Sequence, residues 1–193
     1  MRNIFISLFF SALVFFLWPY IAVFNLYVQL KASNMAGVKK CVDWSSFERN
    51  MQVNIDNLLR AKLKESLNKK ETSYSFDSII LSKQIGGKIA TPQGLIYLFN
   101  QPNKFVQQIH QIFTNTLPAE NINIPASKKK TLKPEGPNFQ DLFERIKYVF
   151  FTEPEEFRLI FNEAGLSFTM DWQLQGLFWK LVRLKIPAKI IQS

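Results

Sequence analysis

The stretch Leu166–Leu174, LSFTMDWQL, decides the fold class because apolar and polar residues alternate along it. Successive side chains of an extended strand point to opposite faces, so this period of two predicts a half-buried β-strand. Trp172 then lies on the buried face, and Asp171 lies on the opposite one. The apolar positions are Leu166, Phe168, Met170, Trp172 and Leu174.

Three further segments near this stretch have the same character. Short turns separate them, at Glu153-Pro154, at 162–165 and at Gln175-Gly176. Connections this short cannot join parallel strands, so an antiparallel meander of four strands is predicted. The three additional strands are expected at Ile146–Phe151, Glu155–Phe161 and Leu177–Ile186.

Amphipathic helices are predicted ahead of the sheet. Residues 45–70 carry apolar side chains at intervals of three and four, and Ser45 with Glu48 matches a capping box. Thr91-Pro92 marks the start of another helix, and a further one is expected at about 103–114. Helices followed by a sheet that needs one face covered predict an α+β fold.

The segment Ile4–Phe24 contains 21 residues and no charge. As a helix it would be about 31 Å long, close to the thickness of a bilayer's hydrocarbon core. We interpret residues 1–30 as an uncleaved signal-anchor, a single-pass transmembrane helix. A cleaved signal peptide is the alternative, but cleavage after Ala22 would put Tyr20 where a small residue is needed. The expected anchor residues include Phe5, Phe9, Phe16, Trp18 and Tyr20.

Charge indicates orientation and partners. The chain carries a formal net charge of +9 and has a pI near 9.7. Arg2 ahead of the apolar segment favours a cytoplasmic N-terminus, with residues 31–193 forming a domain outside the cytoplasm. Residues 115–138 are predicted to be a flexible basic insertion that attracts anionic lipid head groups or an acidic protein. No nucleic-acid recognition motif is present, so nucleic acid is not expected as a partner. The basic loop is represented by Lys128, Lys129, Lys130 and Lys133.

Few residues suggest chemistry. One cysteine and one histidine exclude a disulfide framework and a multi-histidine metal centre, and no nucleophile motif occurs. No catalytic residue, metal or cofactor is therefore predicted. Gly86-Gly87 is interpreted as a turn, and Cys41 as a small buried residue.

Asp43 is open to two interpretations. It stands just before a predicted helix, where a carboxylate caps free backbone N–H groups. Alternatively, it is the polar anchor of a pocket between helices and sheet that aromatic residues such as Phe168 and Tyr148 would line. The candidate pocket residues are Asp43, Trp44, Trp172 and Trp179.

Three segments resemble a bacterial family catalogued as domain of unknown function 2939. They are Pro19–Gln52 with its Val-Asp-Trp motif, Ala90–Leu95 (ATPQGL) and Gly176–Pro187 (GLFWKLVRLKIP). Residues 34–37 depart from the family's pattern, which has an acidic residue there. The resemblance implies a protein of the bacterial envelope and implies no activity. The order of elements is similar to the nuclear-transport-factor-2-like cone, a fold that hosts enzymes and binding proteins alike.

These observations favour a membrane-anchored, non-enzymatic accessory or interaction protein. Its anchor is expected in the bacterial inner membrane, with the C-terminal domain in the periplasm docking on a partner membrane complex. The alternative is a small-molecule-binding or enzymatic domain that uses the pocket around Asp43.

Overall fold

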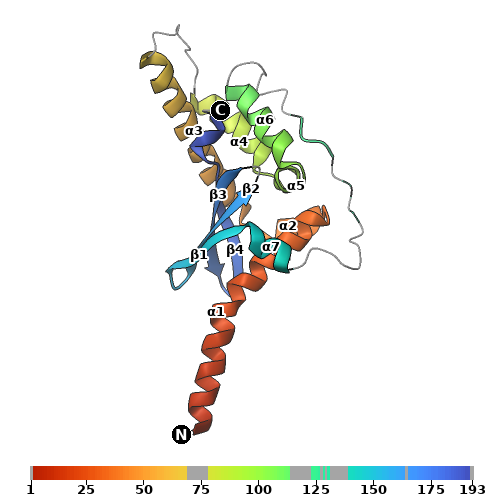
Figure 1. The fold of residues 1–193 in the computed structure, drawn as a ribbon, viewed down its shortest axis with the longest axis vertical. Coiled ribbons are helices and arrows are strands. Elements are labelled where there is room, and N and C mark those ends of the chain that lie inside the picture. Colours follow the sequence, from red (N-terminus) through yellow and green to blue (C-terminus); the bar gives the residue numbers. More distant parts are fainter. Residues whose placement is uncertain are drawn as a thin grey trace.

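The computed structural model describes residues 2–68, 78–113, 123–126, 128, 130, 139–163 and 165–191. Helices come first along the chain and four strands follow, as Figure 1 shows. The helices are α1 (Arg2–Lys31), α2 (Met35–Cys41), α3 (Trp44–Asn68), α4 (Ser78–Ile89), α5 (Pro92–Asn100), α6 (Pro102–Phe113) and α7 (Phe139–Arg145). The strands are β1 (Ile146–Glu153), β2 (Glu156–Glu163), β3 (Leu166–Gln175) and β4 (Phe178–Lys185), followed by a 3₁₀ turn at Ala188–Ile191.

The four strands form one antiparallel sheet in the order β1-β2-β3-β4. In its centre, Met170 of β3 pairs with Leu159 of β2 and with Leu184 of β4. The predicted α+β class and antiparallel meander are confirmed, with each strand within about three residues of its expected bounds. Alternation along β3 also holds, because Phe168, Met170 and Trp172 are buried while Ser167 is exposed.

The C-terminal half of α1 packs against the inner face of this sheet. Val23, Leu26 and Leu30 are buried, and they line a small cavity together with Leu159 and Met170. The helix continues through Pro19, and its N-terminal half projects from the domain (Figure 1). A single helix thus belongs to the core at one end and leaves the domain at the other. Within the described part of the chain, no helix combines the length and apolar composition needed to cross a membrane.

Helix α3 runs beside β4 and bonds to the backbone of this edge strand. Asn50 Nδ2 donates to the carbonyl of Val182 at 2.9 Å, and the amide of Ile186 donates to Asn54 Oδ1 at 2.8 Å. The backbone amide of Asp43 donates to the carbonyl of Leu181 at 3.0 Å. An open strand edge exposes unpaired backbone groups, and these bonds cover the edge at β4.

Two local predictions are wrong. Helix α3 begins at Trp44, and its capping residue is Asp43, whose carboxylate accepts a hydrogen bond from the amide of Ser46, so Ser45 is not the cap. Gly86-Gly87 lies inside α4 rather than in a turn. A Cβ at Gly86 would stand 2.9 Å from Cγ of Gln52, so glycine permits the close approach of α4 to α3. The predicted cap at Thr91 is confirmed, because its hydroxyl accepts from the amide of Gly94.

Candidate functional site

Trp172 and Trp179, two of the predicted pocket residues, lie together in the core. Both are buried, and both pack on Phe157. Trp172 stacks on that ring with centroids 5.5 Å apart, and Trp179 meets it edge-on at 5.1 Å. Aromatic pairs at these separations stabilise a core beyond the area that they bury. This arrangement is a packed aromatic layer.

Among the described residues, a cavity between α1 and the inner face of the sheet is small. Its volume is about 30 Å³, and its wall is almost entirely apolar. Trp172 borders it, and the Nε1 group of Trp172 has no hydrogen-bond partner among the described residues. A space of this size accommodates a single water molecule rather than a metabolite.

Asp43 and Trp44 lie at the start of α3, beside β4, where the amide of Asp43 bonds to the carbonyl of Leu181, the register partner of Trp172. Asp43 Oδ1 accepts from the Ser45 hydroxyl at 2.8 Å, and Oδ2 accepts from Gln175 Nε2 at 2.9 Å. Trp44 Nε1 donates to the carbonyl of Lys39. Of the four candidate pocket residues, only Trp172 borders the 30 Å³ cavity.

The surroundings of Asp43 favour its ionised form. Partial burial alone would raise the pKa of Asp43, but hydrogen bonds from Gln175, Ser45 and Ser46 outweigh it and lower the pKa from 3.8 to about 2. An acid with so low a pKa is a poor proton donor at neutral pH. Its contacts are those of a carboxylate that joins the start of α3 to the end of β3.

The outer face of the sheet carries a charged cluster that the sequence analysis did not single out. Asp171 accepts hydrogen bonds from Arg158 Nε at 2.6 Å and from Arg183 Nε at 2.5 Å. The three residues sit side by side on β2, β3 and β4, because Asp171 is the register partner of both arginines. They border a groove of about 220 Å³, whose far side is formed by Ser46 and Arg49 of α3.

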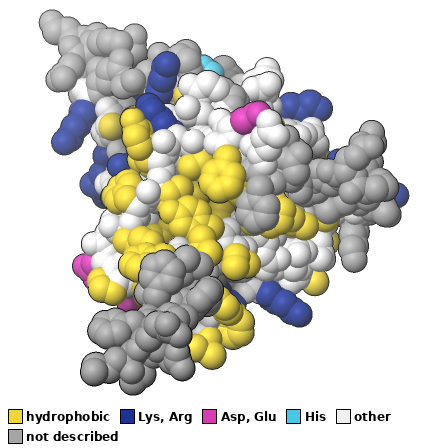
Figure 2. Space-filling model, turned by 60° about the horizontal axis from the view of Figure 1, so that its bottom comes forward, with side chains coloured by type: hydrophobic (Ala, Val, Ile, Leu, Met, Phe, Trp, Pro, Cys, Tyr) yellow, Lys and Arg dark blue, Asp and Glu magenta, His cyan; other side chains and the backbone are white. Residues whose placement is uncertain are grey.

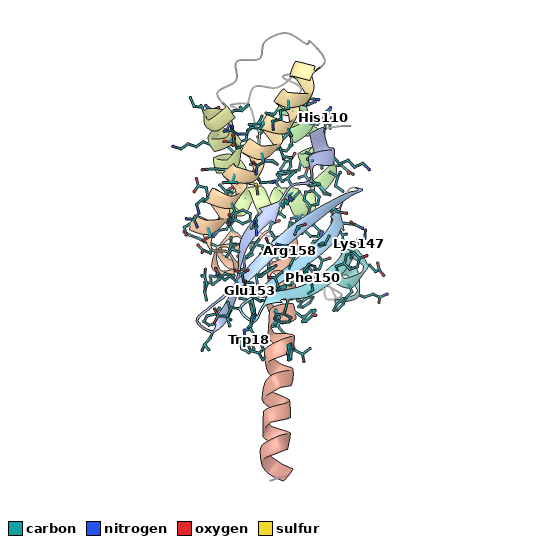
Figure 3. The ribbon with its side chains drawn as sticks, turned by 90° about the vertical axis from the view of Figure 1, so that its left-hand side faces the viewer. Trp18, His110, Lys147, Phe150, Glu153 and Arg158 are labelled. Atoms are coloured by element: carbon teal, nitrogen blue, oxygen red, sulfur yellow. The ribbon has the colours of Figure 1, made fainter. Side chains whose placement is uncertain are left out.

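Exposed aromatic residues continue this face across β1. Tyr148 is 58% exposed and Phe150 is 44% exposed, and they pair with Ile160 and Arg158 of β2. A register shift between Ile146 and Tyr148 precedes them. Tyr148 therefore lies on the outer face rather than beside Trp172, where it was expected. Figure 3 shows Phe150 and Arg158 on this side of the sheet. We call Tyr148, Phe150 and Arg158 the outer strip.

The base of the domain, where α1 leaves it, is apolar. Trp18 Nε1 donates to the carbonyl of Leu177 at the tip of the β3–β4 hairpin, at 3.1 Å. Phe16 meets Phe151 edge-on, with ring centroids 5.7 Å apart. Tyr20, the next predicted anchor residue, is half-buried. The side chains of Phe5 and Phe9 lie outside the described residues. Figure 2 shows apolar side chains gathered around the base.

The described part of the basic segment lies far from the base. The amide of Lys130 donates to the carbonyl of Ala32, and Gln93 Nε2 donates to the carbonyl of Ile124. Lys128 and Lys130 are exposed and border a cavity of about 310 Å³ beside α5. Lys129 and Lys133 lie outside the described residues. Ala32 is 14 residues beyond Trp18, or about 20 Å along a helix.

The described residues contain no group of three or more His, Cys, Asp or Glu side chains able to hold a metal ion. Cys41 is buried, as predicted, and burial raises the pKa of its thiol although Lys180 acts in the opposite direction. His110 Nδ1 lies 3.3 Å from the carbonyl of Ile190, in a packing contact between α6 and the C-terminal turn.

No protein-family model, curated protein or solved structure matches this chain. The resemblance to the family of unknown function, and to the nuclear-transport-factor-2-like cone, therefore stays a prediction.

Proposed function

We propose that this chain is a membrane-anchored accessory protein of the bacterial envelope, without enzymatic activity, whose domain docks on a partner protein in the same membrane. The continuity of α1 carries the proposal. The helix supplies Val23, Leu26 and Leu30 to the core and extends without a break to Arg2. Its projecting part coincides with most of the uncharged segment Ile4–Phe24, whose composition suits a bilayer.

Charge and sequence order support an orientation for this anchor. Arg2 precedes the apolar segment, and the first charge after it is Lys31. Positive charge is retained on the cytoplasmic side of inner membranes, so the domain is proposed to lie in the periplasm. The absence of a linker between anchor and core also favours an uncleaved segment, since cleavage after Ala22 would remove Trp18 and its bond to Leu177.

The outer strip is the proposed docking surface. Interface cores are enriched in tyrosine, phenylalanine and arginine, and here Tyr148, Phe150 and Arg158 adjoin on two neighbouring strands. β1 is an edge strand of the sheet, and its exposed aromatics add apolar area to that edge. The basic segment near Ala32 is too far from the base for contact with head groups, so we assign it to an acidic protein surface.

The alternative of a small-molecule pocket has weaker support. The described cavity between α1 and the sheet is about 30 Å³, and Asp43 does not border it. The cavity of about 310 Å³ lies elsewhere, between α5 and the basic segment, and is not lined by Asp43 either.

Membrane anchoring is tested first by fractionation of cells that express the full chain. The protein should stay in the pellet after alkaline carbonate extraction, and its intact mass should include the first twenty-two residues. A C-terminal alkaline phosphatase fusion should be active, since this enzyme folds in the periplasm. Release by carbonate, or a mass lacking the N-terminal segment, would refute the anchor.

Docking is tested with a photoreactive amino acid placed at Tyr148 in the native host. We expect one dominant crosslinked product of defined mass, which also co-purifies in constant stoichiometry after gentle detergent extraction. The matched control is Val53, which is equally exposed but lies on α3. The same crosslinks from both positions, or none from Tyr148, would show that the outer strip is not the docking surface.

A further inference from the structure

We propose that the base of the domain contacts the membrane directly, with the Leu177–Phe178 tip of the β3–β4 hairpin inserted into the interfacial layer of the bilayer. This inference rests on the proposed membrane anchor. Leu177 is 78% exposed and Phe178 is 63% exposed, the highest values among the large apolar side chains described. We call the tip and the adjoining turn of α1 the basal patch. Its members are Phe15, Phe16, Leu17, Trp18, Leu177 and Phe178.

The tip is unusual for a hairpin turn. Gly176 has a φ of 63°, which glycine adopts readily, and Leu177 completes the two-residue connection. Turns exposed to water favour glycine, proline, asparagine, aspartate and serine. The turn between β1 and β2 is polar by comparison, with Pro154, a favoured turn residue, followed by the charged Glu155. Two large apolar residues at a tip therefore point to a non-aqueous environment.

The tip and the anchor helix are held at the same level. The bond from Trp18 to the carbonyl of Leu177 fixes the hairpin beside the point where α1 leaves the domain. Figure 3 shows Trp18 at this position, below the sheet. Tryptophan concentrates at membrane interfaces, where its ring is buried and its N–H remains hydrogen-bonded.

The continuity of α1 supplies the main argument for insertion. Pro19 and Val23 are buried in the domain, whereas the turn of helix just before them, Phe15 to Trp18, is exposed at its base. This exposed turn belongs to the uncharged segment proposed to cross the bilayer, and no break in the helix separates it from the core. The base of the domain therefore meets the membrane surface directly, which places the tip in the interfacial layer.

Apolar burial, rather than anionic lipid, drives the insertion. The turn between β1 and β2 lies at the same end of the sheet and carries Glu153, Glu155 and Glu156. Lys180 is close to the tip, with its ammonium group 5.8 Å from the centroid of the Phe178 ring and bonded to the carbonyl of Lys40, but the three glutamates outnumber this one positive charge. The bilayer partner is therefore recognised by its hydrophobic interior, and insertion should be equal in neutral and anionic vesicles.

The test uses the full chain in phosphatidylcholine vesicles, with an environment-sensitive fluorophore on single introduced cysteines. Cys41→Ala removes the native thiol in every variant. Leu177→Cys reports the tip, Val14→Cys reports the anchor, and Lys185→Cys is the control at the far end of β4, which is exposed. Unchanged thermal unfolding relative to the Cys41→Ala parent confirms that each variant is folded.

We expect the label at Leu177 to shift to shorter wavelength, to be quenched by lipid-borne nitroxide and to resist aqueous iodide. The label at Lys185 should keep its longer emission wavelength, be quenched by iodide and escape quenching by lipid-borne nitroxide. Lipid quenching at Val14 with iodide quenching at Leu177 would overturn the insertion and leave the anchor intact. Iodide quenching at both Val14 and Leu177 would refute the membrane anchor together with the insertion. Protection of Leu177 from both quenchers would mean that a second copy covers the tip, which also overturns the proposal.

Discussion

The two faces of β3 differ in their surroundings, because one packs into the core and the other faces solvent. Its inner face presents Phe168, Met170 and Trp172 to the core, and all three are buried. Its outer face presents Asp171, which is tied to two partly exposed arginines. The inner face makes close contacts that stabilise the fold, whereas the outer face can change with little cost to folding and is free to interact. Function should therefore be sought on the outer face, at the edges and at the tip.

The largest effect is expected on the inner face. Trp172→Ala removes a ring stacked on Phe157 and should lower the free energy of unfolding by about 3–5 kcal/mol. Trp172→Phe should cost much less, because it keeps a ring and eliminates the unpartnered Nε1 group. Urea denaturation of both variants measures the difference. Equal losses would mean that Trp172 does not stabilise through ring stacking.

Substitutions at the β4 edge of the sheet should cause an intermediate loss of stability. Asn54→Ala leaves the amide of Ile186 without its acceptor in a buried position, at a cost of about 1–3 kcal/mol. Asn50→Ala is the matched control, since its partner is a carbonyl at a half-buried position, and it should lose less. Hydrogen exchange at the amide of Ile186 should accelerate in the first variant and not in the second. A reversed order would contradict the proposed cover of this edge.

A substitution on the outer face of the sheet should lower the free energy of unfolding only slightly. Asp171→Asn removes the charge between Arg158 and Arg183, which are 36% and 47% exposed, so a loss of about 1 kcal/mol or less is expected. The loss should shrink further at high salt. Thermal unfolding at two salt concentrations provides the measurement. A loss as large as that of Trp172→Ala would remove the distinction between the two faces.

The smallest effect is expected at Asp43, and it depends on pH. The pKa is about 2 in the folded protein against an ordinary 3.8, so the folded state binds the proton less readily. The resulting stabilisation is present above about pH 4 and is lost as pH falls toward 2. Asp43→Asn should cost about 1 kcal/mol or less at pH 7, and this cost should shrink as pH falls below 4 and vanish only below the folded pKa. Stability curves of both proteins from pH 2 to 7 test this. A constant difference would exclude ionisation of Asp43 as the cause.

The regular elements were predictable because their patterns are local. Alternation identified β3, and Thr91-Pro92 identified the start of α5. The interior of α4 was not predictable, because Gly86-Gly87 is typical of a turn. These glycines lie in a helix here, where α3 packs closely against Gly86. Asn50 and Asn54 were missed for a similar reason. Two polar residues four apart on a helix usually face water, and only the position of β4 gives them partners.

Of the four candidate pocket residues, only Trp172 borders the 30 Å³ cavity. Trp172 and Trp179 pack on the same ring, that of Phe157, whereas Asp43 and Trp44 lie at the start of α3, a position relative to the sheet that sequence spacing does not provide. Leu177 was assigned to a strand, and its place at a turn next to Gly176 was the available signal. The Arg158–Asp171–Arg183 cluster has no local signal, because strand register alone brings its members together.

Helix α1 has no joint between its projecting part and the part enclosed by the domain. If it crosses the bilayer as proposed, any tilt that the membrane imposes on the helix turns the whole domain by the same angle. Helices adjust their tilt to the thickness of the surrounding hydrocarbon. The direction in which the outer strip faces would then follow membrane thickness, and a partner fixed in the same membrane would meet that strip at an angle set by the lipids around both proteins.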